Sequence, residues 1–384
     1  GGSIPVHRGV VLVMTRFNRI LEIDEENLTA VVEPGVITGD FQKEVERRGL
    51  YYPPDPASQL YCTLGGNVAE CAGGPRAVKY GVTKDYVLGL EVVLPTGEII
   101  QTGVKTMKGV VGYDLTKLFV GSEGTLGIIM KIVLRLIPMP EARMTLMVVF
   151  RTVEDAAMAV SKIIHSKIIP STLEFMDQAS IACVEDYLQI GLPKNAGALL
   201  LIEVDGDREM LPKYIERIDR ITAELDRWEI RIAEDAQTTE LLYKARKAIS
   251  PASYRLNPTK IAEDITVPRN RIATFIKEAR KIAEEKHLKI INFGHAGDGN
   301  IHTSIMIDDK NEEEKRKAEI AIEEIFRLTL RLGGTLSGEH GVGITKAPYI
   351  GMELSREAIE VMKKVKQVLD PNGILNPGKI FGSG

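Results

Sequence analysis

The chain has 384 residues, which is enough for two or three domains with sizeable cores. Its 49 basic and 53 acidic residues give a formal charge of -4, so we expect no nucleic-acid partner. Cys62, Cys71 and Cys183 form no CxxC pair, and we expect inert thiols in a reducing compartment. No apolar run approaches the roughly 20 residues that span a bilayer. We therefore expect a soluble, cytoplasmic protein, peripheral to a membrane only through a partner.

The first part of the chain alternates short β-type runs with glycine-rich turns. Strands are predicted at Val10–Met14, Thr29–Val32, Leu88–Leu94, Glu98–Gln101 and Leu126–Leu136. A helix is predicted at Thr38–Arg48, with Gly49 as its end. Pro138 and Pro140 then punctuate the chain, and we place the domain boundary between residues 139 and 140.

The second part changes to alternating strands and helices. Strands are predicted at Met144–Phe150 and Ala198–Val204, and helices at Val153–Ser166, Glu209–Glu224, Glu312–Leu332 and Ser355–Leu369. This pattern predicts an α+β sheet domain over residues 140–384.

Two glycine-rich motifs concentrate three histidines and a carboxylate. Gly294–His302 contains His295 and His302, and Ser337–Gly343 contains Glu339 and His340. The strand-like runs Lys289–Phe293 and Ile301–Ile307 flank the turn Ala296–Asn300, so a hairpin would bring His295 and His302 together. Imidazole and carboxylate are ligands of catalytic zinc. The alternative is that these histidines only satisfy hydrogen bonds in loops.

Glycine clusters also mark the first domain. Thr63–Gly74 and Gly121–Gly127 would let backbone N–H groups approach a ligand closely. Neither segment is a GxGxxG or GxxxxGK[ST] sequence, so neither predicts a Rossmann or P-loop site. Bulges and tight turns in a glycine-rich sheet domain are the simpler alternative for each segment taken alone.

Taken together, the motifs resemble a known flavoprotein family over essentially the whole chain. Pro53–Ser58, Leu64–Gly74, Lys79–Gly81, Gly112–Leu115 and Gly121–Gly127 resemble the FAD-binding half of the vanillyl-alcohol-oxidase/PCMH superfamily. The two histidine motifs and Asn376–Lys379 resemble its FAD-linked D-2-hydroxyacid dehydrogenases, the branch of D-lactate dehydrogenase and the glycolate oxidase catalytic subunit.

The resemblance implies an α+β fold with a PCMH-type FAD-binding domain at 1–139. A FAD-linked-oxidase C-terminal domain would follow at 140–384, with residues 370–384 returning to the flavin. The implied FAD-binding positions are Gly1, Gly2, Pro54, Asp55, Pro56, Ser58, Leu64, Gly65, Gly66, Asn67, Gly73, Gly74, Gly121, Ser122, Glu123, Gly127, Ile128 and Asn376.

The resemblance also implies the reacting groups. His295, His302 and Glu339 would hold a divalent metal, zinc above all, which polarises the substrate hydroxyl. His340 would take the hydroxyl proton while a hydride passes to flavin N5. The implied substrate-binding residues are Arg246 for the carboxylate, then Ser250, Lys260 and Ser304. We expect Asp298 and Asn300 to shape the turn, with Asp298 as a minor alternative ligand of the metal.

The implied activity is oxidation of a small D-2-hydroxyacid of the lactate or glycolate type to the 2-oxoacid. The implied partners are the substrate and an electron acceptor, which could be a quinone, a cytochrome, an electron-transfer flavoprotein or an iron–sulfur subunit. The chain could also form a homodimer. Two alternatives remain: a metal-free flavoprotein oxidase of the same fold, and a non-catalytic flavoprotein-like subunit. The chain opens at Gly1-Gly2-Ser3, where relatives carry a longer phosphate loop, so we expect an N-terminally truncated domain that binds FAD weakly by itself.

Overall fold

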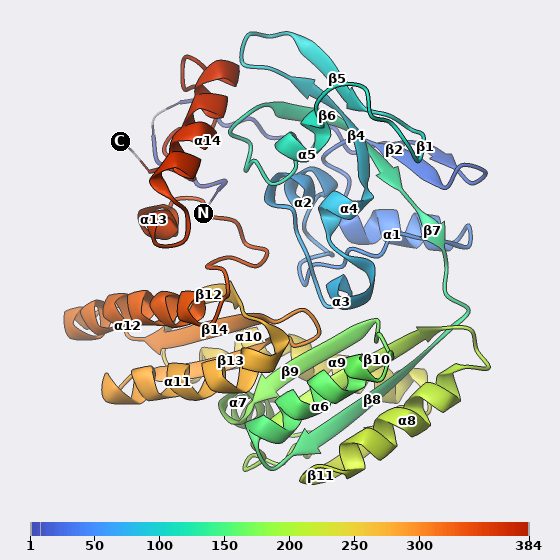
Figure 1. Cartoon of the computed structure of the whole chain (residues 1–384), viewed down its shortest axis with the longest axis vertical. Helices are drawn as coiled ribbons and strands as arrows, with labels where there is room; N and C mark the ends of the chain where they lie inside the picture. The colour runs from blue at the N-terminus through green and yellow to red at the C-terminus, as the bar shows by residue number, and fades with distance from the viewer. Residues whose placement is uncertain (1, 8, 383–384) are drawn as a thin grey trace. The chain divides into compact units, whose positions relative to one another are not determined.

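The computed structural model describes residues 2–7 and 9–382, which divide into two compact units (Figure 1). Unit 1 comprises residues 1–74, 81–139 and 339–384, and unit 2 comprises residues 75–80 and 140–338. The division at 139/140 coincides with the predicted boundary. The structure differs from the predicted domains in returning all of 339–384 to unit 1, rather than 370–384 alone.

Unit 1 is built on a five-stranded antiparallel sheet in the order β1-β2-β6-β4-β5. Its strands are β1 (Ile20–Asp24), β2 (Thr29–Val32), β4 (Val87–Val93), β5 (Ile99–Gly103) and β6 (Ile128–Arg135), with a small ladder of β3 (Leu50–Tyr51) and β7 (Ile137–Pro138). Its helices are α1 (Thr38–Glu46), α2 (Leu64–Glu70), α4 (Thr83–Tyr86), α5 (Leu115–Phe119), α13 (Ile350–Glu353) and α14 (Arg356–Leu369). A T-shaped contact between Phe41 and Tyr52 continues to Tyr86 in its core.

Hydrogen bonds within unit 1 explain why the C-terminal segment joins it. The Lys366 ammonium donates to the carbonyl oxygens of Thr125 and Leu375 at 2.7 and 2.9 Å, and the Asn376 amide donates to the Glu123 carbonyl oxygen at 2.7 Å. The contacts to Thr125 and Glu123 join positions more than 200 residues apart, so no local sequence pattern could have shown them.

Unit 2 is built on a seven-stranded antiparallel sheet in the order β11-β8-β10-β9-β13-β14-β12. Its strands are β8 (Ala142–Phe150), β9 (Thr172–Asp177), β10 (Ala198–Gly206), β11 (Arg227–Ile232), β12 (Thr259–Thr266), β13 (Lys289–His295) and β14 (Asn300–Ile307). Its helices are α3 (Ala77–Tyr80), α6 (Val153–His165), α7 (Gln178–Leu188), α8 (Leu211–Ala223), α9 (Ala236–Lys247), α10 (Ile249–Ser253), α11 (Ile272–Glu285) and α12 (Glu312–Arg331).

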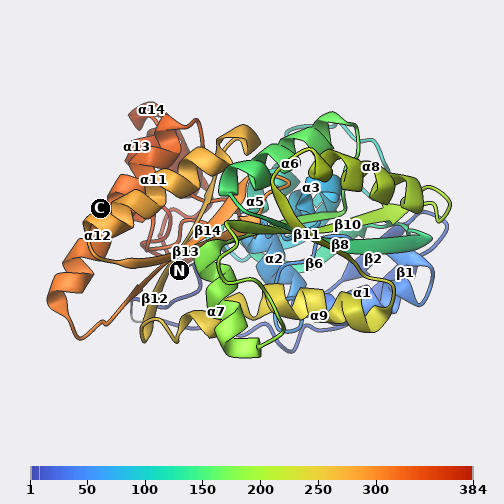
Figure 2. The ribbon, with the colours of Figure 1, turned by 90° about the horizontal axis from the view of Figure 1, so that it is seen from below.

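The long helices of unit 2 cover both faces of its sheet, with α6, α8 and α11 on one side and α7 and α9 on the other (Figure 2). A core beneath α7, α9 and α10 includes Met176, Leu201 and Ile291 from the strands and Ile181 and Ile249 from the helices. The face under α9 and α10 also carries the predicted site residues of this unit, as described below.

One predicted strand is wrong. Residues 10–14 take no part in the sheet ladders of the described chain, and Val10 is 96% exposed. β-branched residues favour a strand only when neighbouring strands pair with them, and here that pairing is missing. The sheet instead begins at β1, where Ile20 pairs with Val32.

Within the described residues, no helix is both long and apolar enough to cross a membrane.

Candidate active site

The hairpin of β13 and β14 brings His295 and His302 together on one face of the unit 2 sheet. His295 lies opposite Asn300, and Phe293 lies opposite His302, so the two histidines are diagonal neighbours. Their ring centroids are 5.2 Å apart and their planes are nearly perpendicular. The predicted hairpin is therefore confirmed.

The turn of this hairpin requires glycine. Gly299 has φ +91°, and a Cβ there would lie 2.0 Å from the Val267 carbonyl oxygen. The Asn300 N–H donates to the Asp298 carboxylate at 3.1 Å, and the Asn300 amide donates to the Ile265 carbonyl oxygen. Asp298 and Asn300 thus shape the turn from which the histidines project.

A buried carboxylate that the sequence did not indicate lies beside His295. Glu174 on β9 is opposite His295 in the sheet and 1% exposed, and its Oε1 lies 2.5 Å from His295 Nδ1. Burial acts to raise the pKa of Glu174, but the charges of Arg246 and His295 outweigh it and lower that pKa. An ionised Glu174 accepts the Nδ1 hydrogen, so Nε2 is the nitrogen of His295 that carries no hydrogen.

Arg246 on α9 is held by the second oxygen of the same carboxylate. Arg246 Nε lies 2.6 Å from Glu174 Oε2, and its guanidinium carbon lies 4.8 Å from the centre of the Phe293 ring. The side chain of Arg246 is 14% exposed. A guanidinium has five donors, and the Nε contact leaves the terminal nitrogens for a carboxylate ligand.

Three further predicted substrate residues lie on the same side of this sheet. Lys260 on β12 donates to Ser250 Oγ at 2.6 Å, and burial lowers the pKa of Lys260. Ser304 lies two residues beyond His302 on β14, is 1% exposed, and its hydroxyl has no partner in the described chain. The side chains of Ser250 and Lys260 are therefore partners of each other in this structure.

Asp264 ties the segment before Glu339 to the histidine strands. Asp264 on β12 lies opposite His302 and is fully buried. It accepts the Gly338 N–H through both its carbonyl oxygen at 3.1 Å and its carboxylate at 3.0 Å. Gly338 is the last residue of unit 2, and Glu339 is the next residue along the chain.

Unit 1 contains a cavity of about 550 Å³ that includes many predicted cofactor positions. Its lining residues are Gly2, Ser3, Pro56, Ala57, Ser58, Cys62, Gly66, Asn67, Ala69, Glu70, Ala72, Glu123, Gly124, Glu339, His340 and Asn376. Such a volume is typical of small-molecule and cofactor sites. Small side chains dominate the lining, which suits the close approach of a flat organic group.

Glu123 anchors the loop that carries His340. The Glu123 carboxylate accepts the N–H groups of Val342 and Gly343, each at 2.7 Å, and Glu123 itself has φ +52°. His340 Nε2 lies 3.7 Å from a carboxylate oxygen of the adjacent Glu339, and the His340 side chain is 53% exposed. The predicted base therefore stands at the cavity of unit 1 with its ring accessible.

The predicted cofactor positions divide into two groups. Gly2, Pro56, Ser58, Gly66, Asn67, Glu123 and Asn376 line the cavity. Pro54, Asp55, Leu64, Gly65, Gly73, Gly74, Gly121, Ser122, Gly127 and Ile128 do not, and Gly1 lies outside the described residues. Several of these support the backbone instead: a Cβ at Gly65 would lie 2.5 Å from Pro34, and one at Gly74 2.5 Å from the Asp55 carbonyl oxygen.

The sequence prediction missed Glu70 on the cavity wall. Gly66, Ala69 and Glu70 lie three and four residues apart on α2, so they share one helix face. Helical spacing was the signal that could have identified Glu70, but the glycines had suggested a loop. The hydroxyl of Thr63 accepts the Gly66 N–H at 3.2 Å and starts this helix.

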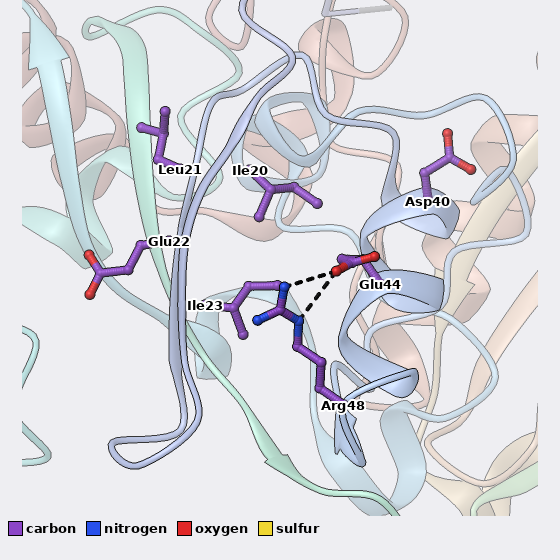
Figure 3. A pocket seen from close by; sticks show the side chains of 7 residues that line it. All are labelled: Ile20, Leu21, Glu22, Ile23, Asp40, Glu44 and Arg48. Carbon is purple, nitrogen blue, oxygen red and sulfur yellow. Dashed lines mark hydrogen bonds and ion pairs between the residues drawn. The ribbon is translucent and has the colours of Figure 1, made fainter.

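A second hollow in unit 1 has a different character. A groove of about 400 Å³ lies between β1 and α1 and is lined by Ile20, Leu21, Glu22, Ile23, Asp40, Glu44 and Arg48 (Figure 3). Arg48 and Glu44 form an ion pair at 3.1 Å on the α1 side of this groove. Its charges are surface ion pairs, which stabilise little and define no reacting centre.

Comparisons with known proteins agree with this architecture. Residues 139–380 match the model of the FAD linked oxidases, C-terminal domain, and residues 1–103 match an FAD binding domain. The chain belongs to the FAD-linked oxidase family, and it is an FAD-linked oxidoreductase of α+β fold.

Close relatives share almost the whole chain. It is 50% identical over 381 residues to the glycolate oxidase subunit GlcD of Bacillus subtilis, covering 99% of this chain and 81% of the relative. It is 37% identical to a D-lactate dehydrogenase of Anaerostipes hadrus, covering 99% and 82%, and 34% identical to a D-2-hydroxyglutarate dehydrogenase of Stutzerimonas stutzeri, covering 99% and 83%.

Solved structures confirm the fold. A p-cresol methylhydroxylase matches with a TM-score of 0.78 at 17% identity, covering 96% of this chain and 79% of that one. An alkyldihydroxyacetonephosphate synthase matches with a TM-score of 0.72 at 22% identity, covering 95% and 67%. At such identities the likeness shows the fold alone.

Proposed function

We propose that this chain oxidises a small D-2-hydroxyacid of the lactate or glycolate type to the 2-oxoacid, with FAD as its cofactor. The observation that carries the proposal is the arrangement of Glu174, His295 and Arg246. The Glu174 carboxylate holds the His295 imidazole and the largely buried Arg246 guanidinium at the same time. The names of the relatives, which include glycolate oxidase and D-lactate dehydrogenase, support the same class of substrate.

The residues of unit 2 suit the substrate's carboxylate and hydroxyl. Arg246 presents a planar fork that pairs with a carboxylate through two parallel hydrogen bonds. Ser250, Lys260 and Ser304 add a hydroxyl, an ammonium and a second hydroxyl on the same side of the sheet. A 2-hydroxyacid offers a carboxylate to the guanidinium and a hydroxyl to the imidazole side of the site.

We propose a divalent metal, zinc, with His295, His302 and Glu339 as its ligands, because imidazole and carboxylate are the donors of a catalytic zinc. Two imidazoles and one carboxylate leave a coordination position open for substrate. Gly338 donates its N–H to Asp264, which lies opposite His302 on β14, and Glu339 is the next residue along the chain. Bound by these residues, a divalent metal would supply Lewis-acid polarisation of the substrate hydroxyl.

His340 is the group we propose as base for the hydroxyl proton. An imidazole suits this role because its pKa lies near the working pH. The loop anchored by Glu123 holds His340 on the wall of the cavity of unit 1, which is the proposed flavin site. FAD bound there supplies the two-electron acceptor chemistry, and the protein supplies binding and orientation.

The electrons must then leave to an acceptor. We propose a separate redox partner, whether quinone, cytochrome, electron-transfer flavoprotein or iron–sulfur subunit. The description of one relative as a subunit of glycolate oxidase supports an assembly of this kind.

A dye-reduction screen tests the activity. Protein supplied with FAD and zinc is given the D- and L-forms of lactate, together with glycolate, 2-hydroxyglutarate and a simple alcohol. We expect dye reduction with D-lactate or glycolate and none with L-lactate or the alcohol. Turnover of the alcohol but not the hydroxyacids would favour a metal-free oxidase of the same fold. No reduction by any of them, with FAD bound, would favour a non-catalytic subunit.

A further inference from the structure

Glu174 uses both of its carboxylate oxygens inside the core of unit 2. Oε1 contacts His295 Nδ1 at 2.5 Å, and Oε2 contacts Arg246 Nε at 2.6 Å. The strand register places Glu174 between His295 on β13 and Leu201 on β10. One side chain therefore joins a strand histidine to a helix arginine.

A carboxylate is a costly residue at this position. Around it the same face carries Met176, Leu201 and Ile291, which pack under α7, α9 and α10. Burying an ion costs several kcal/mol unless its partners are well placed, and a packed apolar residue is often as stable. Stability alone thus does not account for an acid between these two partners.

We propose that Glu174 is a positioning residue that fixes the tautomer of His295 and the direction of the Arg246 fork together, an inference that rests on the proposed function. By accepting the Nδ1 hydrogen, the carboxylate leaves the Nε2 lone pair for a metal ion. By forming its ion pair on the Nε side of Arg246, it leaves the terminal nitrogens for the substrate carboxylate. Metal affinity and carboxylate affinity are then coupled through one side chain.

Replacing Glu174 by Gln separates this role from simple packing. Glutamine keeps the shape but offers one acceptor oxygen and an NH2 group that only donates. With the oxygen toward Arg246, the NH2 group faces His295 Nδ1 and shifts the ring hydrogen to Nε2, which blocks metal coordination. We expect E174Q to bind zinc roughly 10- to 100-fold more weakly in competition with a chromophoric chelator.

Glu203 provides a matched control. It is a buried acid at 5% exposure on the neighbouring strand β10, and its carboxylate accepts the hydroxyl groups of Tyr243 at 2.9 Å and Ser171 at 3.1 Å. It contacts neither His295 nor Arg246 through these hydrogen bonds. We expect E203Q to keep zinc affinity within about twofold of the unmodified chain, although it also removes a buried charge.

A second readout does not depend on metal or turnover. Nitrogen-15 NMR of the six histidines in the metal-free chain reports which ring nitrogen carries hydrogen. We expect His295 to be the Nδ1–H form in the unmodified chain and the Nε2–H form in E174Q. Unchanged zinc affinity in E174Q, or a His295 tautomer that E174Q does not move, would overturn the positioning role.

The two hypotheses fail differently. If the unmodified chain binds no zinc, the proposed metal chemistry fails, and the His295 tautomer still decides whether Glu174 positions the ring. Should E174Q not fold, E174D retains the charge but is one methylene shorter and cannot span both partners. We expect E174D to weaken zinc binding, and unweakened binding in the folded variant would contradict the proposal.

Discussion

The two units hold their predicted reactive residues by different means. In unit 2, Glu174 fixes His295 and Arg246 through side-chain contacts on a regular sheet. In unit 1, Glu123 fixes the His340 loop by accepting the backbone N–H groups of Val342 and Gly343. Side-chain fixation ties function to particular residue types, whereas backbone fixation constrains the path of the chain and leaves intervening side chains free.

The sharpest test of this comparison sets one histidine from each unit against the other. We expect His302→Ala to lose both zinc and turnover, because a ligand is removed. His340→Ala is expected to lower kcat roughly 10²- to 10⁴-fold while keeping zinc, because only the base is removed. Metal analysis and dye-reduction kinetics on the same preparations measure both quantities. Zinc loss in both variants, or in neither, would contradict the division of roles.

A smaller but specific effect is expected at Arg246. Arg246→Ala removes the carboxylate fork, so KM for the hydroxyacid should rise more than kcat falls. Arg246→Lys keeps the charge but loses the planar fork, and should recover only part of the binding. Steady-state kinetics with D-lactate and glycolate give both constants. An Arg246→Ala enzyme with unchanged KM would exclude a substrate role for this arginine.

In unit 1 we expect a loss of stability at Glu123. Glu123→Gln keeps an acceptor but removes the charge that two N–H groups share, and hydrogen bonds to charged groups contribute about 1.5–3 kcal/mol each. We expect the free energy of unfolding to fall by about 2 kcal/mol, with weaker FAD binding. Urea unfolding measures the change in stability, and a flavin fluorescence titration measures the change in FAD affinity. Unchanged stability together with unchanged FAD binding would contradict an anchoring role for Glu123.

The smallest expected effect is a pH dependence at Asp370, which follows α14. Burial acts to raise the pKa of Asp370, but the Lys366 ammonium and the N–H groups of Leu375 and Ile374 lower it below the ordinary value. The pKa of Asp370 is thus lower in the folded state than in the unfolded state, where it is about 3.9. The ionised carboxylate therefore stabilises the fold at any pH above about 3.9, and this stabilisation is lost as the pH falls through the folded-state pKa. Asp370→Asn should therefore destabilise the chain at pH 7 and make little difference near pH 3. The urea midpoints of both proteins at the two pH values measure this difference. An equal loss of stability at both pH values would mean that Asp370 acts through packing and not through its charge.

The sequence by itself determined the elements with strong local signals. The hairpin at 289–307 followed from two alternating runs around a glycine turn, and the long helix α12 from its amphipathic pattern. The motifs also identified the family, because several glycine and histidine clusters occur in a fixed order along the chain. The predicted strand at Val10–Met14 was wrong because β propensity does not supply a pairing partner.

Tertiary structure alone decided how the predicted residues are held. No sequence pattern around Glu174 indicates that it is a site residue. Its role depends on the strand register that places it opposite His295, which is 121 positions away along the chain. Glu123 and Asn376 are likewise joined over 253 positions. Periodicity and turn chemistry are properties of neighbouring residues, so they can be read along the chain. A buried carboxylate shared by a strand and a helix depends on how distant segments pack, which only the folded sheet defines.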